Sequence, residues 1–232
     1  VEEGKSNPSL SPDTEDSKKD PSLSTVKEKL GNILHFKESL EARVDRNKFI
    51  SQKEIPDLLK KGIIATEDRR FYEHGAIDPI GVTRAAVTNY FAGHTLEGGS
   101  TITQQTVKKL FFFLMTGPSF VKWKNSLLPS SWKNYYTKDQ ILELYLNTIY
   151  FGHGAYGLKE ASLTYFGKEP KDLDLSQCAM LAGLPQAPSA YDPIDHPKEG
   201  AQRMTVVLTL MAQQGYISPE DAAKAAMNLW LK

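Results

Sequence analysis

The chain has 232 residues, and its 28 basic and 28 acidic side chains give a formal net charge of zero. A balanced charge provides no overall attraction to nucleic acid or to a membrane, so any such preference has to be local. The single cysteine, Cys178, excludes an internal disulfide, and no stretch of about 18 successive apolar residues could form a transmembrane helix. The chain begins at Val1 without a signal-peptide pattern, so we expect a processed protein or an excised piece of one.

Residues 1–24 consist mainly of Ser, Pro, Asp, Glu and Lys, which bury too little apolar surface to fold, and we predict a disordered or linker segment. The remainder, 25–232, is predicted to form one mainly α domain with short links and no strand ladder. Apolar spacing, Pro and Gly boundaries and a capping box predict helices. Their expected ranges are 26–40, 56–67, 79–93, the stretch through Lys108 to 115, 141–147, 158–166, 176–184, 195–215 and from 218 onwards.

The stretch 63–78 carries the first candidate catalytic residue. An apolar lead-in runs into Glu67 and Asp68, and Arg69 and Arg70 follow at once. Desolvation at the end of an apolar segment raises the pKa of a carboxyl group and suits it to proton transfer, while adjacent arginines would keep it ionised as a base. The competing interpretation is a solvated glutamate at a helix end.

The stretch 98–105 reads Gly-Gly-Ser-Thr-Ile-Thr-Gln-Gln, with three hydroxyls and two amides behind a flexible glycine pair. Hydroxyls and amides both donate and accept hydrogen bonds, so this run could grip a sugar or a phosphate. By its chemistry alone it could equally be a polar loop that caps the next helix.

Together the two stretches resemble the peptidoglycan glycosyltransferase family, the polymerases of bacterial cell-wall glycan. The resemblance covers roughly residues 55–217, with several motifs in the family's order. It implies a lysozyme-like helical fold with a smaller membrane-contacting lobe, expected here at about residues 106–137. It also implies an inverting reaction that joins lipid II, a disaccharide-pentapeptide on undecaprenyl diphosphate, into β-1,4-linked glycan.

The resemblance implies roles for individual residues. Glu67 matches the general base that takes a proton from the acceptor 4-hydroxyl, and Asp68 matches a neighbour that orients the site. Arg84 and Lys108 are expected at the diphosphate, where fixed positive charge stabilises the leaving group. The complete set of candidate substrate-binding residues is Arg84, Gly99, Ser100, Thr101, Gln104, Gln105, Lys108, Lys122 and Lys124.

The family's third motif departs from its pattern in this sequence. A second acid near the diphosphate, linked in the family with a divalent metal, falls on Asn125. Asparagine carries no charge and is a weaker ligand for magnesium or manganese than a carboxylate, which puts the metal in doubt. The five histidines show no metal-ligand spacing, and His74 is expected to orient its turn instead.

Residues 101–138 contain six lysines, no acid and eight aromatic residues. This mixture predicts a surface that lies in a membrane interface beside anionic lipid. Single-stranded nucleic acid is disfavoured, because the rest of the chain is not basic. A buried core segment is the alternative for residues 111–115.

The expected function is polymerisation of lipid II at the extracytoplasmic face of a bacterial cell membrane, with the membrane anchor outside this chain. Implied partners are lipid II, the growing glycan strand and the membrane surface, with cell-division or elongation proteins left open and no nucleic acid. Two rivals stay open: a catalytically weak scaffold of the same fold that binds lipid II, and a muramidase-like hydrolase in which a lone glutamate is the general acid.

Overall fold

The computed structural model describes residues 48–75, 78, 90, 100–106, 108 and 136–228. They all belong to one compact unit, Glu41–Lys232. Its named helices are α2 (Asp57–Glu67), α6 (Lys138–Thr148), α7 (Leu158–Phe166), α8 (Leu175–Gly183), α9 (Pro197–Gln213) and α10 (Pro219–Met227), with 3-10 turns η2 (Pro170–Asp172) and η3 (Leu184–Gln186).

The prediction of a mainly α domain is confirmed in these ranges, where an isolated bridge between Tyr150 and Tyr156 is the sole β pairing. No helix in the described ranges is long and apolar enough to cross a membrane. The predicted disordered segment 1–24 and the helix 26–40 lie outside the described residues. So do most of the helix 79–93 and nearly all of the lobe 106–137.

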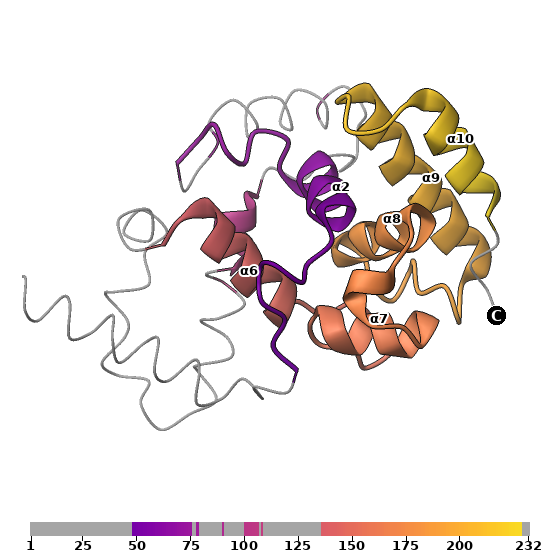
Figure 1. Ribbon diagram of the computed structural model, residues 1–232, viewed down its shortest axis with the longest axis horizontal. Helices are drawn as coiled ribbons and strands as arrows, with labels where there is room; N and C mark the ends of the chain where they lie inside the picture. Colours follow the sequence, from indigo (N-terminus) through magenta and orange to yellow (C-terminus); the bar gives the residue numbers. More distant parts are fainter. Residues whose placement is uncertain are drawn as a thin grey trace, which may run out of the picture. The chain divides into compact units, whose positions relative to one another are not determined.

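Helix α8 is the centre of the packing and contacts α2, α7, α9 and α10 (Figure 1). Its apolar sequence is buried almost throughout, as expected for a helix that is covered on several faces. Gly62 allows α2 to come close to α8, because a Cβ at this position would lie 2.9 Å from the Cβ of Ala182. The end of α2 therefore stands on a rigid base of packed helices.

Side-chain caps set where several helices begin. Thr137 and Gln140 form the predicted reciprocal capping box at the start of α6. Asp174 and Gln177 form a second capping box at α8, and Ser218 caps α10. These caps bond backbone N–H groups that the first helical turn leaves unpaired.

A buried aromatic residue and a hydrogen bond fix the turn between α6 and α7. Phe151 is fully buried, and Tyr165 donates its hydroxyl hydrogen bond to the Phe151 carbonyl oxygen at 3.0 Å. Two further residues share this turn region: His153 has a positive φ of 47°, and Gly157 is the N-cap of α7.

Candidate active site

The site is built around Glu67, the last residue of α2. Its partly buried carboxylate accepts a hydrogen bond from the Gln105 side chain, with 2.9 Å between Nε2 and Oε2. Burial raises the pKa of Glu67, and the Gln105 hydrogen bond and the charge of Arg203 oppose that rise. A carboxylate in these surroundings takes up a proton more readily than a solvated one, as a general base requires.

The contact between Glu67 and Gln105 joins the two stretches that the sequence singled out, which lie 38 residues apart. Gln105 is in turn held by the hydroxyl of Tyr145 on α6, which donates to Oε1 at 3.1 Å. Tyr145 is fully buried. Three elements therefore meet at the carboxylate: the end of α2, the helical segment 102–106, and α6.

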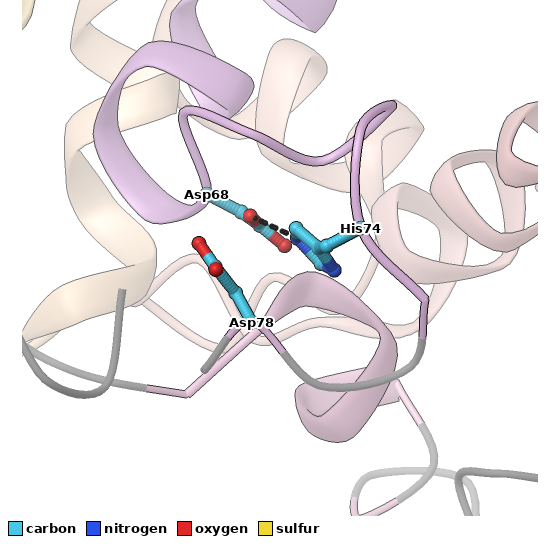
Figure 2. A group of neighbouring side chains, drawn as sticks. All are labelled: Asp68, His74 and Asp78. Atoms are coloured by element: carbon cyan, nitrogen blue, oxygen red, sulfur yellow. Dashed lines mark hydrogen bonds and ion pairs between the residues drawn. The ribbon is translucent and has the colours of Figure 1, made fainter. Parts of the chain in front are cut away.

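Asp68, directly after α2, also connects α2 to the helical segment 102–106. Its buried carboxylate bonds His74 Nε2 at 2.6 Å through one oxygen and accepts from the Ile102 backbone N–H at 3.1 Å through the other. Figure 2 shows His74 approaching Asp68, with Asp78 turned towards the same point. Asp68 thus connects the turn at His74 to the second stretch, and its expected role in orienting the site stays a prediction.

Asp68, His74 and Asp78 place one ligand atom each within 4.8 Å of one another, an arrangement that the histidine spacing did not suggest. However, each oxygen of Asp68 already accepts a hydrogen bond, and Asp78 lies 3.5 Å from the guanidinium of Arg70. A divalent ion would have to compete with all of these contacts. These side chains thus already serve as hydrogen-bond and ion-pair partners for one another and for their neighbours.

A second group of possible ligands, His153, Asp192 and Asp195, lies at the turn after α6 and at the loop before α9. Asp192 is buried and also accepts from the Ile194 backbone N–H at 2.9 Å. Asn125, the position on which the second acid of the resembled family falls, lies outside the described residues and belongs to neither group.

The second stretch uses some of its polar side chains to build its own helix. The Thr101 hydroxyl accepts from the Gln104 N–H at 3.1 Å, and the Gln104 side chain accepts from the Thr101 N–H at 2.9 Å. The capping interpretation thus has direct support for this pair, while Gln105 turns to the glutamate. Ser100 and Lys108 are exposed. Contact of these residues with substrate stays a prediction.

The remaining candidates lie outside the described residues: Arg84, Gly99, Lys122 and Lys124.

The expected effect of the neighbouring arginines on Glu67 is corrected. Arg69 is exposed, and Arg70 pairs with Glu73 at 3.1 Å and with Asp78. In the described part of the chain, the cation that lowers the pKa of Glu67 is Arg203, on α9.

Sequence reasoning missed Arg203 and Tyr145. Both carry a weak signal: Tyr145 occupies the apolar face of α6, where a phenol hydroxyl needs a partner, and Arg203 borders the apolar face of α9. The Arg203 Nε donates to the Gly183 carbonyl oxygen at 3.1 Å, and its guanidinium lies 5.5 Å from the Tyr191 ring centroid. These contacts fix the guanidinium, whose charge acts on Glu67.

His74 also lines a pocket of about 220 Å³. Lys138 at its rim donates to the Gly75 carbonyl oxygen at 3.1 Å and lies 4.3 Å from the centroid of the Phe71 ring. Burial lowers the pKa of Lys138, and the charge of Asp68 opposes this. The lining residues are His74, Gly75, Thr103, Tyr136, Thr137, Lys138 and Ile141.

Comparison with known proteins finds one matching family model and several similar penicillin-binding proteins. The family model described as Transglycosylase matches residues 35–212. Penicillin-binding protein 1F of Bacillus subtilis (strain 168) is 46% identical over 177 residues, which cover 76% of this chain and 24% of that protein. Penicillin-binding protein 1A/1B of the same strain is 42% identical over 218 residues, which cover 92% and 23%.

Penicillin-binding protein 1A of Escherichia coli (strain K12) is 44% identical over 169 residues, covering 72% of this chain and 20% of that protein. The crystal structure of penicillin-binding protein 1A from Haemophilus influenzae aligns at 36% identity and a TM-score of 0.39, over 54% of this chain and 16% of that one. The chain thus spans about a quarter of the length of the curated relatives it matches.

Proposed function

The chain belongs to the transglycosylase family, and from this premise we propose that it acts as a peptidoglycan glycosyltransferase that polymerises lipid II. The observation that carries the proposal is the hydrogen bond between Glu67 and Gln105. It joins an acid with a raised pKa to the polar stretch that the resemblance assigns to substrate binding. A base beside a row of hydrogen-bonding groups is what transfer to a sugar hydroxyl needs.

In the proposed reaction, ionised Glu67 takes the proton of the acceptor 4-hydroxyl as that oxygen attacks the anomeric carbon of the donor sugar. The new carbon–oxygen bond forms while the bond from the anomeric carbon to the diphosphate breaks. Undecaprenyl diphosphate leaves with the bonding electron pair. Attack from the face opposite the leaving group inverts the α-linked donor into a β-1,4 link.

The leaving diphosphate gains negative charge, and positive groups near it lower the barrier. Lys108 is exposed one turn beyond Gln105 and is the described candidate for this role. Arg84, Lys122 and Lys124 are proposed partners from segments outside the described residues. A divalent ion near the diphosphate also stays a proposal, because its expected acid falls on Asn125.

The proposed setting is the extracytoplasmic face of a bacterial cell membrane, where lipid II presents its sugars. Support comes from the relatives, which are penicillin-binding proteins, and from the basic and aromatic composition of residues 101–138. Cell-division or elongation proteins are further partners that the resemblance leaves open.

The test is to incubate this chain with lipid II and resolve the products by length. Glycan strands of many disaccharides are expected, with release of undecaprenyl diphosphate. Binding of lipid II without polymer would favour the scaffold rival. Shortening of preformed glycan, without synthesis, would favour the hydrolase.

A further inference from the structure

Tyr145 is a buried residue to which the reaction described so far gives no part. The Tyr145 side chain projects from α6 and is fully buried in the protein core. Its hydroxyl nevertheless donates a hydrogen bond to Gln105 at the edge of the site. Burial and the nearby charges of Glu67 and Asp68 raise the pKa of Tyr145, so the hydroxyl keeps its proton and can act as a donor. The partner atom at 3.1 Å is Oε1 of the Gln105 amide.

The direction of these hydrogen bonds decides what the amide does. A side-chain amide donates through its nitrogen and accepts through its oxygen. When the Tyr145 proton occupies Oε1, Nε2 is left to donate to the Glu67 carboxylate, as observed at 2.9 Å. The flipped amide would place its oxygen against the carboxylate, which is repulsive unless Glu67 is protonated.

We infer that Tyr145 is a positioning residue for the base: its hydroxyl holds the Gln105 amide in the orientation that donates to the ionised carboxylate of Glu67. The two hydrogen bonds form a series from Tyr145 through Gln105 to Glu67, and this series links the buried face of α6 to the end of α2. Hydrogen bonds in such a series polarise one another, and the last one is strengthened by the charge of its acceptor.

The hydrogen bond from Gln105 is one of several influences on the pKa of Glu67. Arg203 on α9 favours the ionised carboxylate, whereas burial and the adjacent Asp68 disfavour it. Arg203 acts on Glu67 through its charge, and its Nε donates to the Gly183 carbonyl oxygen. Among the described residues, Gln105 is the side chain that donates a hydrogen bond directly to this carboxylate.

The decisive variant is Tyr145→Phe, which removes the hydroxyl and keeps the ring that fills the core. The Glu67 pKa is to be measured from the pH dependence of its side-chain carboxyl ¹³C resonance, without substrate. We expect a rise on the order of one pH unit. The acid limb of the polymerisation rate should move to higher pH by the same amount, so that the rate below that limb falls about tenfold and recovers at higher pH.

Two controls separate positioning from simple loss of stability. Ser176→Ala also removes one buried hydroxyl hydrogen bond, from Oγ to the Ala225 carbonyl oxygen at 3.0 Å, and should leave the Glu67 pKa unchanged. In a Gln105→Ala background, Tyr145→Phe should add no further shift, because its effect passes through the amide.

A Glu67 pKa that stays within a few tenths of a unit in Tyr145→Phe would overturn the inference. An equally large shift in the Gln105→Ala background would overturn it too. The inference rests on the proposed function for its meaning in catalysis, but the resonance measurement does not use turnover. A wild-type chain that fails to polymerise lipid II would therefore count against the function alone.

Discussion

At the scale of single residues, Glu67 carries the sharpest expectation. Glu67→Gln should abolish polymerisation while lipid II binding stays near normal, because an amide keeps the shape of the carboxylate but takes no proton. General-base catalysis typically contributes about 10²–10⁴-fold. Product release from labelled lipid II, with affinity measured in parallel, checks this. More than roughly a tenth of the wild-type rate in the variant would rule out Glu67 as the base.

The pH dependence of the reaction tests the role of Arg203. Its positive charge lowers the pKa of Glu67, so Arg203→Gln should raise that pKa and move the acid limb of the rate profile to higher pH, by up to about one unit. Glutamine retains an N–H for the Gly183 carbonyl oxygen. Arg69→Gln is the matched control, because Arg69 adjoins the site in sequence but is exposed. Equal shifts in the two variants would argue against a specific effect of Arg203.

Lys108→Ala tests the proposed contact with the diphosphate. An exposed ammonium packs little, so the variant should lose lipid II affinity by on the order of 1.5–3 kcal/mol, with little change in melting temperature. Lys171→Ala, also at an exposed lysine, serves as the comparison for a general loss of charge. Unchanged affinity in Lys108→Ala, or an equal loss in both variants, would contradict the assignment.

The residues of the site were partly predictable, for a physical reason. Glu67 and Gln105 belong to short stretches whose composition is unusual by itself, so each could be recognised locally. Tyr145 and Arg203 act across 40 residues or more, and their own stretches look like ordinary amphipathic helix. The effect of Arg70 was misjudged because adjacency in sequence ignores the direction in which the chain leaves a helix.

At the scale of elements, the turn before α7 depends on Gly157. Its φ of 82° and ψ of 159° lie in a region open essentially to glycine alone, and a Cβ would stand 2.7 Å from the Asn147 carbonyl oxygen. Gly157→Ala should therefore cost on the order of 3 kcal/mol of unfolding free energy.

Gly154→Ala is the matched control, because Gly154 also has a positive φ, 74°, but nothing lies within 4 Å of its Cβ position. It should cost on the order of 1 kcal/mol. Denaturant unfolding of both variants measures the difference. A Gly154→Ala loss as large as that of Gly157→Ala would show that the close carbonyl oxygen is not what matters.

Helix ends were the most predictable feature of the elements, because caps are local. The box at Thr137 and Gln140, the break at Gly167 and the start at Ser218 are confirmed. The end of α8 differs from expectation, since Pro185 lies inside a 3-10 turn that continues the chain after Gly183. How helices cross was not predictable, because it depends on close approaches such as that at Gly62.

At the scale of the whole molecule, stability should change with pH through Glu67. Its folded pKa is raised above the ordinary value of 4.5, so the folded state binds a proton more tightly than the unfolded state. The stability from this group is full below the unfolded pKa and is lost as pH rises through the folded pKa. Glu67→Gln should then melt near the wild-type temperature at pH 4 and on the order of a few degrees above it at neutral pH.

Thermal melts of the two proteins across this pH range provide the measurement. A melting difference that shrinks as pH rises would contradict the sign of the shift. Lower stability of Glu67→Gln at every pH would show instead that the lost carboxylate contacts outweigh the relief of burial.

The position of Glu67 at the end of α2 has a consequence for how such a protein can be altered. The last turn of α2 holds no basic residue, and the aligned peptide dipoles make a helix C-terminus an unfavourable place for an anion. Glu67→Gln is therefore expected to stabilise the fold at neutral pH, whereas the proposed mechanism predicts that it abolishes turnover. A library of variants ranked by heat resistance alone would enrich inactive proteins at this position, so directed evolution of a more robust enzyme has to score each round by product formed.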